Sequence, residues 1–195
     1  MDERTLAALC KEGDRSALQS LYEMYAPWMM GISMRYVGDA ERSRDILHDC
    51  FVKIFGSVAR FEYRGVGSLR AWIGRIVVNT ALESLNKRHR VSYADEFDAC
   101  ADDPGAAPGA IADAEDGDDD VQLYRAVSDQ TIIRCVGGLP VRLRVVFNLF
   151  FFEDVPHGEI ARRLGISESA SKTRLHRAKI LLANALREHI KTTEK

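Results

Sequence analysis

Two groups of side chains that can bind nucleic acid recur at helical spacing in this 195-residue sequence. In the first group, Arg75, Asn79, Leu82 and Asn86 follow an i, i+4, i+7, i+11 pattern. The segment then ends in a basic run, Lys87, Arg88, His89 and Arg90. Arg and Asn side chains donate hydrogen bonds to phosphates and base edges. A solvated face with cations at a helix C-terminus explains the same pattern, and the row taken alone favours that interpretation.

A loop before this row adds aromatic side chains. Phe61 and Tyr63 stand among Arg60, Arg64 and two glycines, and Ser68 follows them. An exposed aromatic ring offers a surface on which an unstacked base can lie. Aromatic residues in loops more often cover a core. The loop and the row together nevertheless favour contact with single-stranded or melted nucleic acid.

The second group lies near the C-terminus, in the segment 168–190. One face carries hydroxyl, imidazole and cationic side chains: Ser169, Lys172, Thr173, His176, Lys179 and, at its border, Arg177. The opposite face carries the small and apolar residues Ser171, Leu175, Ala178, Leu182 and Ala185. A helix of this kind packs through its apolar face and can enter a major groove with the other. A basic solvated face is the alternative interpretation.

The turn before this segment decides between the two interpretations. A short helix is predicted over Pro156–Leu164, followed by Gly165, Ile166 and Ser167. Gly165 can adopt the left-handed conformation that ends a helix, and Ser167 can cap the next one. Ile166 can fill the angle between them. This spacing is typical of a helix-turn-helix and therefore favours DNA contact.

A more apolar helix is predicted upstream, beginning at Leu139-Pro140. It contains Val145, Val146, Phe147, Leu149, Phe150, Phe151 and Phe152. The number of apolar residues in this helix exceeds what one buried stripe requires. The helix is either enclosed within its small module or exposes a patch for a protein partner, and the residues themselves support both interpretations equally.

The first ninety residues predict a helical bundle. Apolar residues recur at helical spacing after Asp14, a favourable N-cap, and again over 46–58 and 69–80. Gly38-Asp39 provides a stop and a start signal between the first two of these helices. No run of residues alternates as in a strand, so the expected fold class is all-α.

Charge divides the chain into three parts. Residues 1–92 carry a net charge of +3 and residues 139–195 carry +5, whereas residues 93–138 carry −10. The stretch 92–120 has few large apolar side chains and self-repelling carboxylates, which predicts a flexible linker. We therefore expect two small helical domains, 1–91 and 121–195, joined by an acidic linker, 92–120. The run Asp118–Asp120 lacks the spaced ligands of a calcium loop, so we expect no metal site there.

The composition excludes other classes of protein. Hydrophobic residues make up 46% and charged residues 29% of the chain, as in ordinary soluble proteins. The longest apolar stretch is broken by Asn148 and is far shorter than the ~18 residues of a membrane helix. The charged start opens no signal peptide, so we expect a cytoplasmic protein with no membrane insertion. Cys10, Cys50, Cys100 and Cys135 are widely spaced, which predicts reduced, mostly buried thiols and neither metal nor cofactor.

Two sets of motifs resemble the extracytoplasmic-function (ECF, group 4) RNA polymerase sigma factors. Residues 45–55, Phe61 and residues 67–79 are similar to region two of that family. Leu139-Pro140 and the segments 159–161, 164–167 and 172–179 are similar to its region four. The resemblance covers both predicted domains in the expected order, and it would require two independent coincidences to arise by chance.

The resemblance implies a promoter-specificity subunit of bacterial RNA polymerase that catalyses no reaction. Its partners would be promoter DNA and core RNA polymerase, and an anti-sigma factor is a further partner that the family allows. The clamp helices of the polymerase would contact Asp45, His48, Asp49, Phe51 and Lys53, and the flap would contact the apolar helix through Phe150 and Phe152. The minus-ten element would be captured and melted by Phe61, Tyr63, Arg64, Ser68, Arg75, Asn79, Asn86 and Arg88. The minus-thirty-five element would be read by Ser169, Lys172, Thr173, His176, Arg177 and Lys179.

Two other classes of function compete with this interpretation. A stand-alone regulator would use the N-terminal bundle to dimerise or sense a signal and would bind DNA without polymerase. A metal-dependent nucleic-acid enzyme would use the Asp run, but no supporting His or Lys constellation accompanies it.

The sequence departs from the family pattern at several positions. His48 stands where Gln is common, and Glu83 and Asn86 replace the usual Asp and Arg, which removes one cation from the row. Ser171 stands on the buried stripe where Val is usual. We therefore expect Ser171→Val to stabilise the isolated C-terminal module by about 1 kcal/mol through apolar burial. An unchanged or lower melting temperature would show an exposed or hydrogen-bonded Ser171.

Overall fold

Helices form all the regular secondary structure of the residues that the computed structural model describes, 1–91 and 127–193. Side chains are described for residues 1–87 and 127–192. The chain divides into two units, Met1–Arg88 and His89–Lys195. The all-α prediction is therefore confirmed. The predicted linker, 92–120, and the Asp118–Asp120 run lie outside the described residues.

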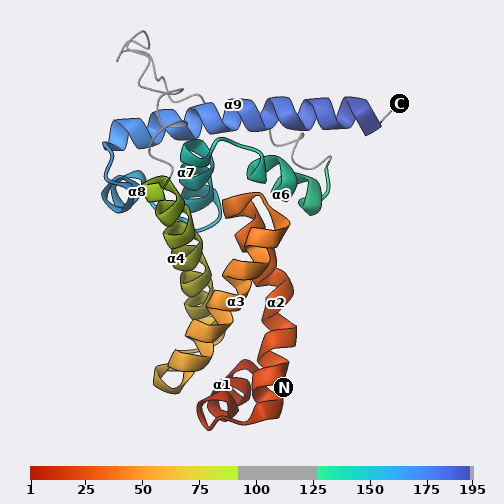
Figure 1. The fold of residues 1–195 in the computed structure, drawn as a ribbon, viewed down its shortest axis with the longest axis vertical. Helices are drawn as coiled ribbons and strands as arrows, with labels where there is room; N and C mark the ends of the chain where they lie inside the picture. Colours follow the sequence, from red (N-terminus) through yellow and green to blue (C-terminus); the bar gives the residue numbers. More distant parts are fainter. Residues whose placement is uncertain (92–126, 194–195) are drawn as a thin grey trace. The chain divides into compact units, whose positions relative to one another are not determined.

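The first unit contains four α-helices and one short 3-10 helix among its described residues (Figure 1). These are α1 (Glu3–Lys11), α2 (Arg15–Val37), α3 (Ala40–Ser57), η1 (Val58–Arg60) and α4 (Ser68–Val91). The Asp14 side chain caps α2 by accepting from Ala17 N at 2.7 Å, as its position predicts. Gly38 ends α2 at a φ of 71°, and Asp39 then caps α3. Both predicted helix boundaries are confirmed.

Apolar side chains from every helix of the first unit form its core. Helix α1 packs against α2 and η1, and α2 packs against α3. The fully buried residues include Leu6, Leu21, Met29, Ile54, Leu69, Ile73 and Val77. Along α4, the stripe predicted over 69–80 is buried except for the half-buried Trp72 and Ile76, and burial continues to Leu85. The position of this buried stripe determines which side of α4 faces solvent.

The second unit is organised around its long C-terminal helix (Figure 1). Its described helices are α6 (Asp129–Gly137), α7 (Val141–Phe151), α8 (His157–Leu164) and α9 (Glu168–Thr193), and α9 packs against the other three. Gly165 ends α8 at φ 66° and ψ 34°. Ser167 Oγ accepts from Ala170 N at 3.0 Å. The predicted turn chemistry is confirmed, and the α8–α9 pair forms the expected helix-turn-helix.

Helix α7 is partly enclosed and partly exposed, so each of the two interpretations of its apolar sequence holds for one part of it. The side chains of residues 145–149 are buried. Phe151 and Phe152, at the C-terminal end, keep exposed fractions of 41% and 39%. Most of the helix is therefore core, and only its end offers an apolar surface.

The described cysteines fit the expected reduced thiols. Cys10, Cys50 and Cys135 are free, the first two buried and the third half-buried. Burial raises the pKa of the Cys50 thiol to about 11, which keeps it protonated at neutral pH. Cys100 lies outside the described residues.

Ser171 lies on the buried stripe, as predicted, and its hydroxyl has a partner there. It is fully buried, and its hydroxyl lies 2.9 Å from His157 Nδ1 at the start of α8. The imidazole in turn stacks on Phe150, with 4.7 Å between ring centroids. Ser171 therefore links the two helices of the helix-turn-helix, and this hydrogen bond argues against the stabilising effect expected of Ser171→Val.

We now predict that Ser171→Val lowers the free energy of unfolding by about 1 kcal/mol, because it leaves the half-buried His157 nitrogen without its partner. Ser169→Val, on the exposed face of the same helix, is the matched control for the lower helix propensity of Val. Thermal unfolding of the full chain measures both. Equal effects of the two substitutions would contradict a stabilising hydrogen bond at Ser171.

The partial burial of His157 makes stability depend on pH. Burial, followed by the nearby Lys172 charge, lowers the pKa of His157 below its ordinary 6.5, against a smaller opposing effect of Glu168. The unfolded chain therefore binds this proton more readily, and stability is lost as pH falls through and below about 6.5. We predict that unfolding free energy falls more between about pH 7.5 and pH 5.5 in the wild type than in His157→Gln. A difference between the two proteins that is constant with pH would contradict this.

Candidate nucleic-acid interface

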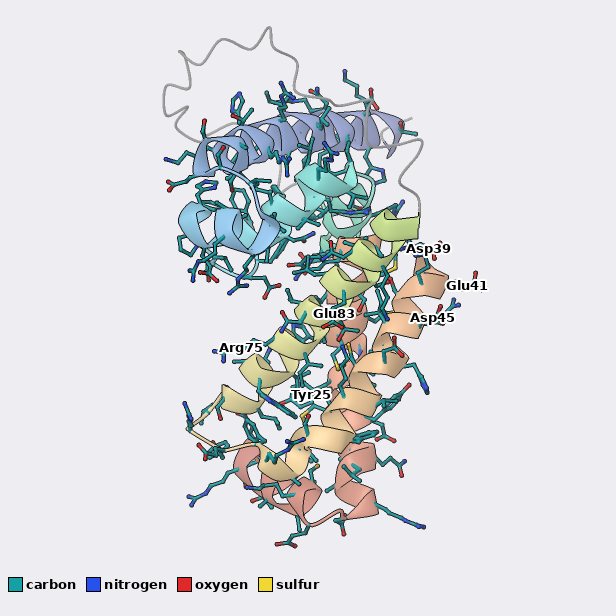
Figure 2. All side chains as sticks on the ribbon, turned by 60° about the vertical axis from the view of Figure 1, so that its left-hand side comes forward. Tyr25, Asp39, Glu41, Asp45, Arg75 and Glu83 are labelled. Carbon is teal, nitrogen blue, oxygen red and sulfur yellow. The ribbon has the colours of Figure 1, made fainter. Side chains whose placement is uncertain are left out.

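The solvent side of α4 carries the first polar row. Arg75, Asn79, Asn86 and Lys87 are exposed, whereas Leu82 is half-buried. Figure 2 shows Arg75 projecting from α4 on the side away from α3. The row lies beside the buried stripe, so its donors face solvent without disturbing the core. Arg88 belongs to the last turns of α4, and its side chain lies outside those described.

The loop before α4 exposes only part of the predicted set. Tyr63 and Ser68 are half-buried and Arg64 is exposed. Phe61 has an exposed fraction of 6% and packs on Trp72, with 5.1 Å between ring centroids. The expectation that Phe61 offers a base-stacking surface is therefore wrong for this conformation. Its ring is more favourably buried against Trp72 than hydrated.

The helix-turn-helix presents the second polar row on α9. Ser169, Lys172, His176 and Arg177 are exposed, and Thr173 and Lys179 are half-buried. Lys172 forms an ion pair with Glu168 at 3.2 Å. Lys179 lies over the Phe151 ring at 5.2 Å from its centroid. The fold thus brings the whole predicted set to one side of α9, with Leu175, Ala178 and Leu182 buried opposite.

The solvent face of α3 holds acidic and apolar side chains together. Asp45, His48 and Asp49, predicted to contact polymerase, are exposed. Phe51 is 4% exposed and lies between Tyr22 and Phe55, at centroid distances of 4.6 and 5.6 Å. The expectation that Phe51 contacts a partner directly is wrong here, because packing of these rings places it in the core.

Two apolar residues of α3, Val52 and Phe55, are exposed, which the sequence pattern did not predict. Val52 is 60% exposed and Phe55 is 41% exposed. Helical spacing assigned Phe55 to the buried stripe, yet it lies at the edge of the core beside Phe51. Together with His48 they follow an i, i+4, i+7 row, the signal by which they could have been found.

Lys53 connects α3 to α4. Its ammonium lies 2.7 Å from Glu83 Oε2 and donates to Thr80 Oγ1 at 3.0 Å. The lysine and glutamate side chains remain 44% and 61% exposed. Glu83 stands one turn from both Asn79 and Asn86. Lys53 therefore neutralises an anion beside the polar row of α4.

Of the two phenylalanines predicted to contact a partner in the second unit, Phe152 is exposed and Phe150 is half-buried on His157. Phe152 and Phe151 form the exposed apolar end of α7. Phe150 helps to hold the helix-turn-helix together.

None of the described helices is long and apolar enough to cross a membrane.

Comparison with known proteins identifies the family. Residues 21–91 match the model for "Sigma-70 region 2", and residues 129–182 match the model for "Sigma-70, region 4". The chain belongs to the RNA polymerase sigma factors of the extracytoplasmic-function type. Sigma factors are DNA-binding transcription initiation factors that act with RNA polymerase.

Two curated relatives match along almost their whole length. The RNA polymerase sigma-H factor of Pseudomonas aeruginosa is 26% identical, with 94% of this chain and 93% of the relative covered. The ECF RNA polymerase sigma-E factor of Escherichia coli is 23% identical, with 98% and 97% covered. A solved structure, the sigma factor RpoE in complex with the anti-sigma factor NepR from Bartonella quintana, is similar with 18% identity and a TM-score of 0.47, covering 87% of this chain and 96% of that one.

We predict that the Lys53–Glu83 ion pair adds less than about 1 kcal/mol to stability, because both side chains are largely exposed. A double-mutant cycle of Lys53→Met, Glu83→Gln and the combined variant, followed by thermal unfolding, measures the coupling. A coupling well above that value would show that the bridge is a main structural link between α3 and α4.

Proposed function

We propose that this sigma factor binds core RNA polymerase, recognises the minus-ten and minus-thirty-five promoter elements, and promotes promoter melting. The observation that carries the proposal is the presence of two helical units, in the order region two then region four, that each present a polar and cationic row opposite a buried stripe. We further propose that the units correspond to domains 1–91 and 121–195, separated by 92–120, and that the protein acts with polymerase in the cytoplasm.

The proposed minus-ten surface consists of the α4 row and the loop before it. Arg75, Asn79 and Asn86 supply donors for phosphates and base edges. Tyr63 and Arg64 supply a ring and a guanidinium on which an unpaired base can stack. Phe61 has no direct role in this proposal, since it is buried.

The proposed minus-thirty-five surface is the polar side of α9. In a helix-turn-helix, the N-terminal residues of the second helix contact base edges in the major groove. Ser169, Lys172 and Thr173 occupy the first turns of α9, and His176, Arg177 and Lys179 follow. We assign base contacts to the first turns and phosphate contacts to the cations.

Core polymerase is the partner that we propose for the remaining exposed surfaces. The clamp would contact Asp45, His48 and Asp49 and, in place of Phe51, the exposed Val52 and Phe55. The flap would contact Phe152 and Phe151 at the end of α7. Burying apolar side chains within a polar rim favours a protein interface. An anti-sigma factor is a second partner that would compete for these surfaces.

Promoter opening follows from differential binding. Unpairing and unstacking cost a few kcal/mol per base. A small helical unit binds only the opened strand through its loop, so it stabilises melted DNA that polymerase holds in place. The sigma factor thus acts as a trap for the opened strand.

Transcription in vitro with purified core RNA polymerase over a library of promoter sequences tests the proposal. Initiation that depends on both the chain and the polymerase supports it. DNA binding that is specific without polymerase, and no initiation with it, would instead favour a stand-alone regulator.

We predict that Arg75→Ala/Asn79→Ala lowers initiation by the holoenzyme at least about tenfold, because it removes two groups of donors from the minus-ten surface. Arg15→Ala/Gln19→Ala is the matched control, since it removes an Arg and an amide at the same i, i+4 spacing from exposed positions of α2. Core polymerase affinity should be unchanged in both. Equal initiation by the two double variants would refute the minus-ten assignment.

A further inference from the structure

The N-terminal helix contacts the loop that precedes α4. Glu3, in the first turn of α1, accepts two backbone hydrogen bonds from residues more than sixty positions away. Its Oε2 accepts from Gly67 N at 2.5 Å, and its Oε1 accepts from Leu69 N at 2.6 Å. Both bonds are partly buried.

These bonds replace a cap that α4 cannot make for itself. The carbonyl of Gly67 accepts the first helical bond, from Ala71 N at 2.9 Å, so Gly67 occupies the N-cap position. A glycine has no side-chain oxygen to accept from the N–H groups of the first turn. The φ of Gly67, +85°, is unfavourable for the residues that usually supply that oxygen. The Glu3 carboxylate provides the missing acceptor from another helix.

Packing and charge hold Glu3 in this position. Asp2 caps α1 by accepting from Thr5 N at 2.9 Å, which fixes the first turn that carries Glu3. Leu6, Ala7 and Cys10 of α1 are buried against neighbouring elements. A carboxylate at a helix N-terminus also interacts favourably with the helix dipole. Hydrogen bonds to an ionised acceptor are stronger than neutral ones.

The loop that Glu3 holds is the proposed capture loop for the opened strand. Gly67 is its last residue, and Arg64 N donates to Ser68 Oγ at 3.2 Å across the same turn. Gly65 and Gly67 both have positive φ, so the loop conformation is accessible mainly to glycine. Within the loop, Ser68 N also donates to the Gly65 carbonyl at 3.1 Å, and Arg64 pairs with Glu62 at 3.2 Å. A loop that is ordered before it binds DNA pays less entropy on binding.

We propose that Glu3 is a positioning residue for strand capture: by capping α4 from α1, it preorganises Tyr63, Arg64 and Ser68 to receive an unpaired base. The proposal rests on the function proposed above. It extends the DNA-binding apparatus to a helix that precedes the region-two match, which begins at residue 21. Because the Glu3 carboxylate occupies the N-terminus of α4, a DNA phosphate cannot bind at that position.

Glu3→Gln tests this role in the full-length protein bound to core polymerase. The probe is a fluorescent single-stranded DNA with the non-template minus-ten sequence of a promoter that the wild-type holoenzyme uses. We expect Glu3→Gln to weaken binding of this DNA about tenfold, with unchanged affinity for core polymerase. Glu12→Gln, the same change at an exposed position after α1, is the control and should bind like the wild type. Wild-type DNA affinity in Glu3→Gln, or parallel loss of core polymerase affinity, would overturn the proposal.

Hydrogen exchange of the free protein gives an independent readout. The amides of Gly67 and Leu69 should be protected in the wild type and exchange at least about tenfold faster in Glu3→Gln, while those in the middle of α4 stay unchanged. Unchanged protection at both amides would overturn the cap itself. A wild-type holoenzyme that fails to bind the single strand would contradict the proposed function instead, and the exchange result would still test Glu3.

Discussion

The burial of one face of α4 is the constraint on which the first unit depends. Leu69, Ile73, Val77 and Leu85 are all 5% exposed or less. Because this stripe is buried in the core, the opposite side of α4 faces solvent. The 3.6-residue repeat of the helix then places Arg75 and Asn79 on the solvent-exposed side. The same core sets the orientation of α3. Its apolar contacts therefore position both the polar row of α4 and the acidic and apolar solvent face of α3.

The second unit also buries one side of a long helix, α9, and exposes the other. Helix α9 packs against three shorter helices and keeps a polar side for solvent. The angle between α8 and α9 depends on the left-handed Gly165 and on the His157–Ser171 contact. This contact gives the second unit a polar element in its interior. Its geometry is therefore more sensitive to protonation than an all-apolar interface would be.

Local signals in the sequence predicted much of this architecture, and contacts between distant residues account for what they missed. Capping residues such as Asp14 and Asp39, and the Gly165–Ser167 turn, act within a few residues, so their effects could be read directly. Phe51 and Phe61 were assigned to partner surfaces by the family resemblance, which does not show that Tyr22 and Trp72 cover their rings. The partners of Ser171 and Glu3 lie 14 and more than 60 positions away, and no pattern within one helix reveals them.

We propose that the two units contact two separate promoter elements in one complex with polymerase. A photo-crosslinking amino acid placed at position 79 in one protein and at position 176 in another tests it most directly, with each protein assembled into an open promoter complex. The account predicts crosslinks from position 79 to the minus-ten element and from position 176 to the minus-thirty-five element. Crosslinks from both positions to the same element, or none from position 79, would contradict it.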